Sequence, residues 1–225
     1  MPRRPRCCPG GTVFHVLNRS VARLTLFEKP EDYQAFYRVL GEAWTETPIR
    51  ILDWCLMPNH WHFVVWPEND AQTTDFFRWL THTHTMRWHA HHGTLGTGHL
   101  YQGRFKSFPV EEHEHLYAVL RYVERNARRA NLAERAEAWR WGSAWLRQHA
   151  GPSEKRILSD WPVPIPSEWL EWVNQAQDEQ ELAAIRRCVQ RGTPFGDPQW
   201  VTNTAARLGL GYTLRPRGRP SKSAV

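Results

Sequence analysis

Alternation of apolar and polar positions is clearest between Leu56 and Pro67, where a Met-Pro-Asn turn leads into His-Trp-His-Phe-Val-Val-Trp. Successive side chains of a strand point to opposite faces, so His60 and His62 share one face and Trp61 lies on the other. Two imidazoles on one face of a strand can share a metal ion. An H-x-H pair alone is nevertheless a weak motif for such a site.

The remaining periodic segments predict a mixed fold. A helix is expected to begin at Pro30 and to end before Pro48. Further strands are predicted at residues 12–18, 49–55 and 104–110, and further helices at residues 75–92 and 111–131. The order is strand-helix-strand-strand-helix-strand, followed by a helix. This order predicts an α+β fold in which helices cover one face of an antiparallel sheet.

The helix predicted at 111–131 has distinct faces. Its buried stripe is formed by Leu116, Val119, Leu120 and Val123. Tyr122 and Asn126 are four residues apart, so roughly 40° separates them around the axis and they flank the stripe together. Tyr117 lies roughly 140° from Tyr122, on the other flank. The helix therefore presents one tyrosine and one amide together beside the sheet.

Five segments are expected along the chain. Residues 1–11 form a basic arm, and residues 149–166, which are rich in proline, form a linker or extended wrap. A C-terminal region at 167–212 contains two helices, one opened by a capping box at 178–181 and one by Asp197-Pro198. These helices fit a helix-turn-helix or an ordinary helical hairpin. Residues 213–225 form a basic tail.

The composition indicates which kinds of partner and location to expect for the protein. The net charge is +6 and the sequence pI is about 9.4, which favours a polyanionic partner such as nucleic acid. The four cysteines form no C-x-x-C motif, so neither a zinc ribbon nor a disulfide framework is expected. The sequence shows no membrane span and no signal peptide, and a reducing cytoplasm is the expected location.

Three motifs occur in a characteristic order: Met57-Pro58-Asn59-His60-Trp61-His62, then Gly103-Arg104-Phe105-Lys106-Ser107, then Leu120-Arg121-Tyr122-Val123-Glu124-Arg125-Asn126. Together they resemble the single-tyrosine HUH transposases and, more narrowly, the REP-associated tyrosine transposases. The resemblance covers roughly residues 12–148. It departs from the family at Ala127, where relatives often have proline.

The resemblance implies a ferredoxin-like catalytic domain at 12–148. It also implies that Tyr122 is the nucleophile and that His60, His62 and Asn126 hold Mg²⁺ or Mn²⁺. The implied substrate is single-stranded or hairpin DNA, cut through a 5′-phosphotyrosine intermediate and rejoined without a nucleotide cofactor. A monomer and a homodimer both remain open, as does whether Tyr122 serves the histidines of its own chain.

Several basic residues are candidate DNA contacts. Arg104 and Lys106 alternate along a predicted strand, and Arg129 lies near the Tyr122 face of its helix. In the tail, Arg217 and Arg219 flank a glycine as in an AT-hook core, which lies in the minor groove. A solvated strand face explains Arg104 and Lys106 equally well. A disordered basic tail explains Arg217 and Arg219 equally well. Five histidines between residues 82 and 92 are interpreted as polar helix surface or DNA-facing side chains, not as a second metal site.

Two other functions fit the same residues. A rolling-circle initiator or relaxase uses the same ligands and tyrosine. A non-catalytic repressor could keep the fold without the chemistry, although the intact Tyr122, His60 and His62 argue against it.

Overall fold

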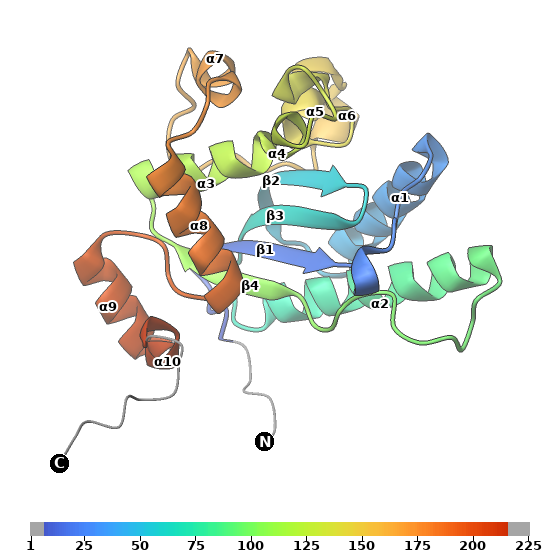
Figure 1. The fold of residues 1–225 in the computed structure, drawn as a ribbon, viewed down its shortest axis with the longest axis horizontal. Helices are drawn as coiled ribbons and strands as arrows, with labels where there is room; N and C mark the ends of the chain where they lie inside the picture. Colours follow the sequence, from blue (N-terminus) through green and yellow to red (C-terminus); the bar gives the residue numbers. More distant parts are fainter. Residues whose placement is uncertain (1–6, 216–225) are drawn as a thin grey trace, which may run out of the picture.

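The computed structural model describes residues 7–215. At its centre is a four-stranded antiparallel sheet with the strand order β2-β3-β1-β4 (Figure 1). The strands are β1 (Val13–Arg19), β2 (Arg50–Met57), β3 (His60–Trp66) and β4 (Lys106–Val110). The Met-Pro-Asn segment forms the tight connection between β2 and β3, as the sequence predicted.

Ten α-helices and two short 3₁₀ helices accompany the sheet in the described part of the chain. The first group is η1 (Val21–Arg23), α1 (Pro30–Glu46), α2 (Gln72–His92), α3 (Glu114–Glu124), α4 (Asn126–Arg129), η2 (Ala136–Ala138) and α5 (Ser143–His149). The second is α6 (Pro152–Lys155), α7 (Trp169–Asn174), α8 (Glu179–Arg191), α9 (Pro198–Arg207) and α10 (Gly211–Leu214).

Helices α1 and α2 pack side by side on one face of the sheet. Helix α1 begins at Pro30, where Asp32 accepts a hydrogen bond from the Lys29 amide and caps the first turn. Alternate residues of β3, Trp61 and Phe63, are fully buried against this layer. Trp61 stacks on Phe77 of α2 with the ring centres 5.4 Å apart.

The other residues of the same strands face α3. They form a second core cluster with the apolar stripe of α3, which includes Leu116 and Val119. The predicted α+β class with an antiparallel sheet is confirmed. The predicted layer of helices on one face corresponds to α1 and α2, and α3 with the helices that follow it adds a layer on the opposite face (Figure 1).

Two predicted elements are shorter than expected. The helix predicted at 111–131 is interrupted at Arg125, which separates α3 from α4. The strand predicted from Arg104 begins at Lys106. Gly103 has φ +152°, a conformation that favours glycine, and its carbonyl accepts a hydrogen bond from Asn18. Arg104 therefore lies in a loop before β4 and does not alternate with Lys106 along a strand.

The C-terminal helices pack back on the sheet domain. Both α7 and α8 contact α3, and α8 also contacts β4. Asp178 caps α8 by accepting hydrogen bonds from the amides of Gln180 and Glu181. The predicted capping box is incomplete, because the Glu181 carboxylate accepts from the Gln177 side chain. The helix ends at Gly192 with φ +73°. Between residues 7 and 215 no helix has the length and apolar character that a membrane span requires.

Candidate functional site

Two buried histidines meet on the α3 face of the sheet. His62 on β3 and His15 on the neighbouring strand β1 project to the same face, and His15 Nε2 lies 2.8 Å from His62 Nδ1. Both side chains are almost completely buried. Burial lowers the pKa of His15 to about 3 and that of His62 well below its usual value, so both rings are neutral.

His60 is adjacent, at the start of β3. Its ring centre lies 5.0 Å from that of His62, with the ring planes at 75°. Its Nδ1 lies 2.6 Å from the side-chain oxygen of Asn59. Burial, and then the positive charges of Arg19 and Arg129, lower the pKa of His60 to about 3. Its ring is therefore neutral as well, as a metal-binding imidazole must be.

Tyr122 on α3 closes the site from above the sheet. Its ring centre is 5.8 Å from that of His62 and 6.1 Å from that of His15, both edge-on. Tyr117 points elsewhere, since its hydroxyl donates a hydrogen bond to the Pro164 carbonyl at 2.5 Å. The structure thus brings the predicted tyrosine to one predicted histidine, His62, and to His15, and leaves the other tyrosine of the helix outside.

Asn126 and Arg129 complete the group. Both lie on α4, and a guanidinium nitrogen of Arg129 donates a hydrogen bond to Asn126 Oδ1. The centre of the guanidinium is 4.4 Å from the centre of the Tyr122 ring. Three buried polar atoms here have no hydrogen-bond partner among the described residues: His15 Nδ1, Asn126 Nδ2 and one terminal nitrogen of Arg129. Buried orphans of this kind mark a place where a ligand can complete the bonding.

The residues present fit a divalent ion. Because Nδ1 of His60 and Nδ1 of His62 are each held by a neighbour, Nε2 is the nitrogen that each ring offers to a metal. The ring centres of His60 and His62 lie 5.0 Å apart, close enough for both imidazoles to serve one ion. Asn126 Oδ1 retains a second lone pair beside the bond from Arg129. Two nitrogens and one amide oxygen leave positions open for phosphate and water.

A basic cavity of about 740 Å³ opens beside Tyr122. It lies between β1, the loop before β4, and α8. No carboxylate is among its lining residues. Its cationic residues are Arg19, Arg104, Lys106, Arg186 and Arg191. The two predicted phosphate contacts, Arg104 and Lys106, therefore line the same cavity as Tyr122, whereas His60 and His62 do not line it.

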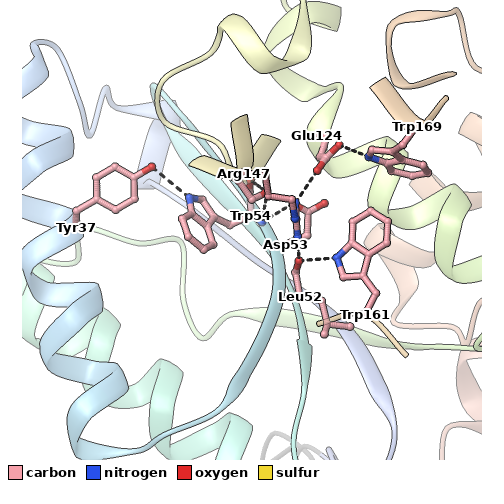
Figure 2. A network of polar contacts seen from close by, with 9 residues as sticks. Tyr37, Leu52, Asp53, Trp54, Glu124, Arg147, Trp161 and Trp169 are labelled. Carbon is pink, nitrogen blue, oxygen red and sulfur yellow. Dashed lines mark hydrogen bonds and ion pairs between the residues drawn. The ribbon is translucent and has the colours of Figure 1, made fainter. Parts of the chain in front are cut away.

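A buried ionic network anchors α3 to the sheet (Figure 2). Arg147 donates to Glu124 at 2.8 Å and lies 3.6 Å from Asp53 on β2. Glu124, two residues beyond Tyr122, also accepts a hydrogen bond from Trp169 at 2.7 Å. Burial, and then the neighbouring Glu124 charge, raise the pKa of Asp53 well above its usual range. One guanidinium thus holds two buried carboxyl groups, and burial raises the pKa of both.

Several arginines of the tyrosine helix have structural partners. Arg121 and Arg125 donate to main-chain carbonyls of residues 172–176 at the end of α7. In the histidine-rich helix, His84 was expected at the surface but is buried and lies 2.8 Å from the Tyr101 hydroxyl. Its position among Phe76, Phe77 and Leu80 places it on the buried stripe of α2.

Sequence reasoning missed two residues of the site, His15 and Arg19. Both lie on β1, and only the register of β1 against β3 brings them to His62 and His60. The structure also gathers Glu111, His115 and Asp197, whose ligand atoms lie within 4.8 Å of one another. That group is seven residues or more from Tyr122 in sequence and was not predicted. Arg217 and Arg219 lie outside the described residues.

Comparison with known proteins identifies the fold family. The model of the family described as "Transposase IS200 like" matches residues 11–126, about half of the chain. A solved REP-associated tyrosine transposase bound to a REP hairpin is 18% identical, with a TM-score of 0.49; the match covers 74% of this chain and 95% of that one. A transposase structure from Deinococcus radiodurans R1 is 17% identical, with a TM-score of 0.37, covering 55% and 96%. No curated protein matches.

Proposed function

The chain belongs to the IS200-like transposase family, and from this premise we propose that it cuts and rejoins single-stranded DNA through a covalent bond between Tyr122 and a 5′ phosphate. The observation that carries the proposal is the position of Tyr122, which lies against His62 and also lines a cavity bordered by five cationic residues and no carboxylate. Such a cavity attracts a phosphodiester backbone and brings it to the phenol.

The reaction would proceed by two transfers. In the first, the Tyr122 oxygen bonds to the phosphorus while the bond from phosphorus to the 3′ oxygen breaks. The proton lost by the phenol is balanced by the one that the leaving 3′ oxygen takes up. In the second, a 3′-OH of another strand attacks the phosphotyrosine and restores the phenol. Each transfer exchanges one phosphoester for another, so no energy-rich cofactor is required.

We assign His60, His62 and Asn126 to Mg²⁺ or Mn²⁺. When bound, the ion would polarise the phosphate and stabilise the charge on its oxygens. His15 is assigned a positioning role, since it holds the ring of His62 through Nδ1. Arg129 lies against both Tyr122 and Asn126, where its charge can offset negative charge that develops during transfer.

We further propose that Arg19, Arg104 and Lys106 contact the phosphates of the strand in the cavity. The three motifs that resemble REP-associated transposases support a hairpin as the DNA element next to the cut. Arg217 and Arg219 remain proposed minor-groove contacts of the tail.

The test is adduct formation with a hairpin-bearing single strand and Mn²⁺, read on a denaturing gel. The unmodified protein should give a shifted protein–DNA band. Tyr122→Phe keeps the ring and its packing but removes the attacking oxygen, so it should bind DNA and give no band. Tyr117→Phe is the matched control and should give the band. An adduct in Tyr122→Phe would place the nucleophile elsewhere, and tight binding without adduct from any variant would favour a non-catalytic repressor.

A further inference from the structure

A second cavity, of about 640 Å³, lies on the other side of the molecule from Tyr122. Its walls come from α1, from residues 140–146 and from α6, and Trp54 of β2 is among its lining residues. Trp54 belongs to the core cluster that α1 and α2 form, whereas Tyr122 belongs to the cluster on the α3 face. The cavity is therefore separated from the proposed cleavage site by the sheet.

Five aromatic side chains are among the residues that line this cavity, and hydrogen bonds orient three of them, Tyr37, Trp44 and Trp54. Tyr37 accepts a hydrogen bond from Trp54 Nε1 at 3.2 Å (Figure 2). Trp44 donates to the Ile49 carbonyl at 3.1 Å. Tyr37, Trp44 and Trp145 are only partly buried, so parts of their rings remain accessible. Oriented, accessible rings offer flat surfaces on which another planar ring can stack.

Three guanidinium groups border the same cavity. The side chains of Arg38, Arg140 and Arg156 make no hydrogen bond and no close ion pair within the described residues. Arg140 lies over the rings of Trp141 and Trp145, at 5.4 and 5.7 Å from their centres.

The two carboxylates among the lining residues are already engaged. Glu42 forms two hydrogen bonds with Arg87, at 2.8 and 2.7 Å, and Glu154 accepts from the Gly151 amide at 3.2 Å. The cavity thus offers guanidinium groups without a close carboxylate partner beside aromatic rings that remain partly accessible. Planar rings joined by anionic groups complement such a surface.

We propose that this cavity is a second binding site for single-stranded DNA, in which an unpaired base stacks on Tyr37, Trp44 or Trp145 and the flanking phosphates pair with the three arginines. The inference rests on the proposed function for the presence of single-stranded DNA, and adds a site that does no chemistry. Duplex DNA does not fit this role, because its bases are already stacked inside the helix. The arginines come from three separate segments, which favours a strand with several phosphates over one free nucleotide.

Binding should be measured by fluorescence anisotropy with the full chain and two hairpin oligonucleotides, one carrying a long single-stranded extension and one with only the nucleotides needed for cleavage. Trp145→Leu should weaken binding of the extended strand roughly 5- to 100-fold, the effect of losing one stacked base. Arg140→Gln should weaken it and reduce the slope of log affinity against log salt by about 1. Neither variant should change adduct formation on the short hairpin.

Arg78→Gln is the matched control, since Arg78 is an exposed arginine of α2 already paired with Asp75 at 3.0 Å. It should leave the preference for the extended strand unchanged. A strand carrying 5-iodouracil in its extension should cross-link to residues 141–147 on irradiation. Arg140 is exposed and not part of the core, so its variant remains informative if Trp145→Leu proves unstable.

The proposal is overturned if both variants bind the extended strand as the unmodified protein does, or if all cross-links map to the Tyr122 cavity. Equal competition by free thymidine monophosphate or by polyglutamate would replace a strand site with a nucleotide or an acidic-peptide site. If the unmodified protein forms the adduct but neither variant weakens binding of the extended strand, this site alone is rejected. If the unmodified protein forms no adduct while Trp145→Leu still weakens binding of the extended strand, the proposed cleavage is rejected instead.

Discussion

The two faces of the sheet use the same strands for opposite purposes. Toward α1 and α2, Val16 and Phe63 are fully buried in an apolar core. Toward α3, the neighbouring residues His15 and His62 are equally buried but polar. Leaving a buried polar atom unpaired costs about 1–3 kcal/mol, and three such atoms surround Tyr122. Both faces bury an apolar core, and α2 also holds unpaired buried atoms, at Thr73 and His89. The α3 face differs in gathering three such atoms beside one tyrosine, where a ligand can complete their bonding.

Substitutions on one face of β3 at a time test whether the two faces have different roles. Replacing His60 and His62 together by alanine should lower the cleavage rate at least about 10³-fold, because a metal contributes several kcal/mol to phosphate activation. EDTA should have the same effect on the unmodified protein. Both are measured as adduct formation on a hairpin strand.

Phe63→Leu on the opposite face of β3 is the control for that experiment. It should lower the free energy of unfolding by about 1–2 kcal/mol while the folded protein still cleaves. Full activity of the double histidine variant in EDTA would show that cleavage does not require a metal ion.

A smaller effect is expected from His15. His15→Phe keeps the ring packed against Phe108 but removes the nitrogen that holds His62. Mn²⁺ affinity, measured by titration calorimetry, should fall roughly 10- to 100-fold. His84→Phe, the corresponding change on the opposite face, should leave the metal affinity unaltered. Equal affinity in His15→Phe would show that this histidine only fills space.

The α1–α2 face should also lose stability in acid, because it buries a neutral histidine. Burial lowers the pKa of His84 to about 3, below the 6.5 of the unfolded chain. The unfolded state therefore binds the proton first, and stability is lost as the pH falls from about 6.5 towards 3. In urea titrations with EDTA, His84→Gln should reduce this slope by up to about 1.4 kcal/mol per pH unit. An unchanged slope would mean that His84 is protonated in the folded protein.

The smallest effect should come from the basic C-terminal tail. Deleting residues 216–225 removes Arg217 and Arg219, so duplex affinity should fall and the slope of log affinity against log salt should shrink by about 2. Cleavage of a short single strand should persist. Identical binding at low and high salt would show that the tail makes no DNA contact.

Periodicity predicted the elements of the sheet domain because each strand and helix buries one face, and burial leaves a local pattern in the sequence. It placed Tyr122 with Asn126 and away from Tyr117 for the same reason. It could not find His15 or Arg19, since their role depends on the register of β1 against β3, which is set by contacts distant in sequence.

The interruption at Arg125 was also invisible in the sequence. Neither glycine nor proline occurs at residues 124–129, and helix propensity favours continuation there. In the structure, the Arg125 side chain donates to the carbonyls of Val173 and Asn174, so a tertiary contact accompanies the break. A pattern of single residues contains no information about a partner 48 positions away.

The unit of homology and the unit of folding differ in this protein. Residues 11–126 define the family, yet Arg121 within them is buried and directs its donors to the carbonyls of Trp172, Gln175 and Ala176. A fragment that ended at residue 126 would leave the Arg121 guanidinium in an apolar setting without hydrogen-bond acceptors. Exchange of the C-terminal segment between relatives would therefore succeed only if it carried a matching helix end. The C-terminal helices are therefore a structural partner of the tyrosine helix and not an independent unit.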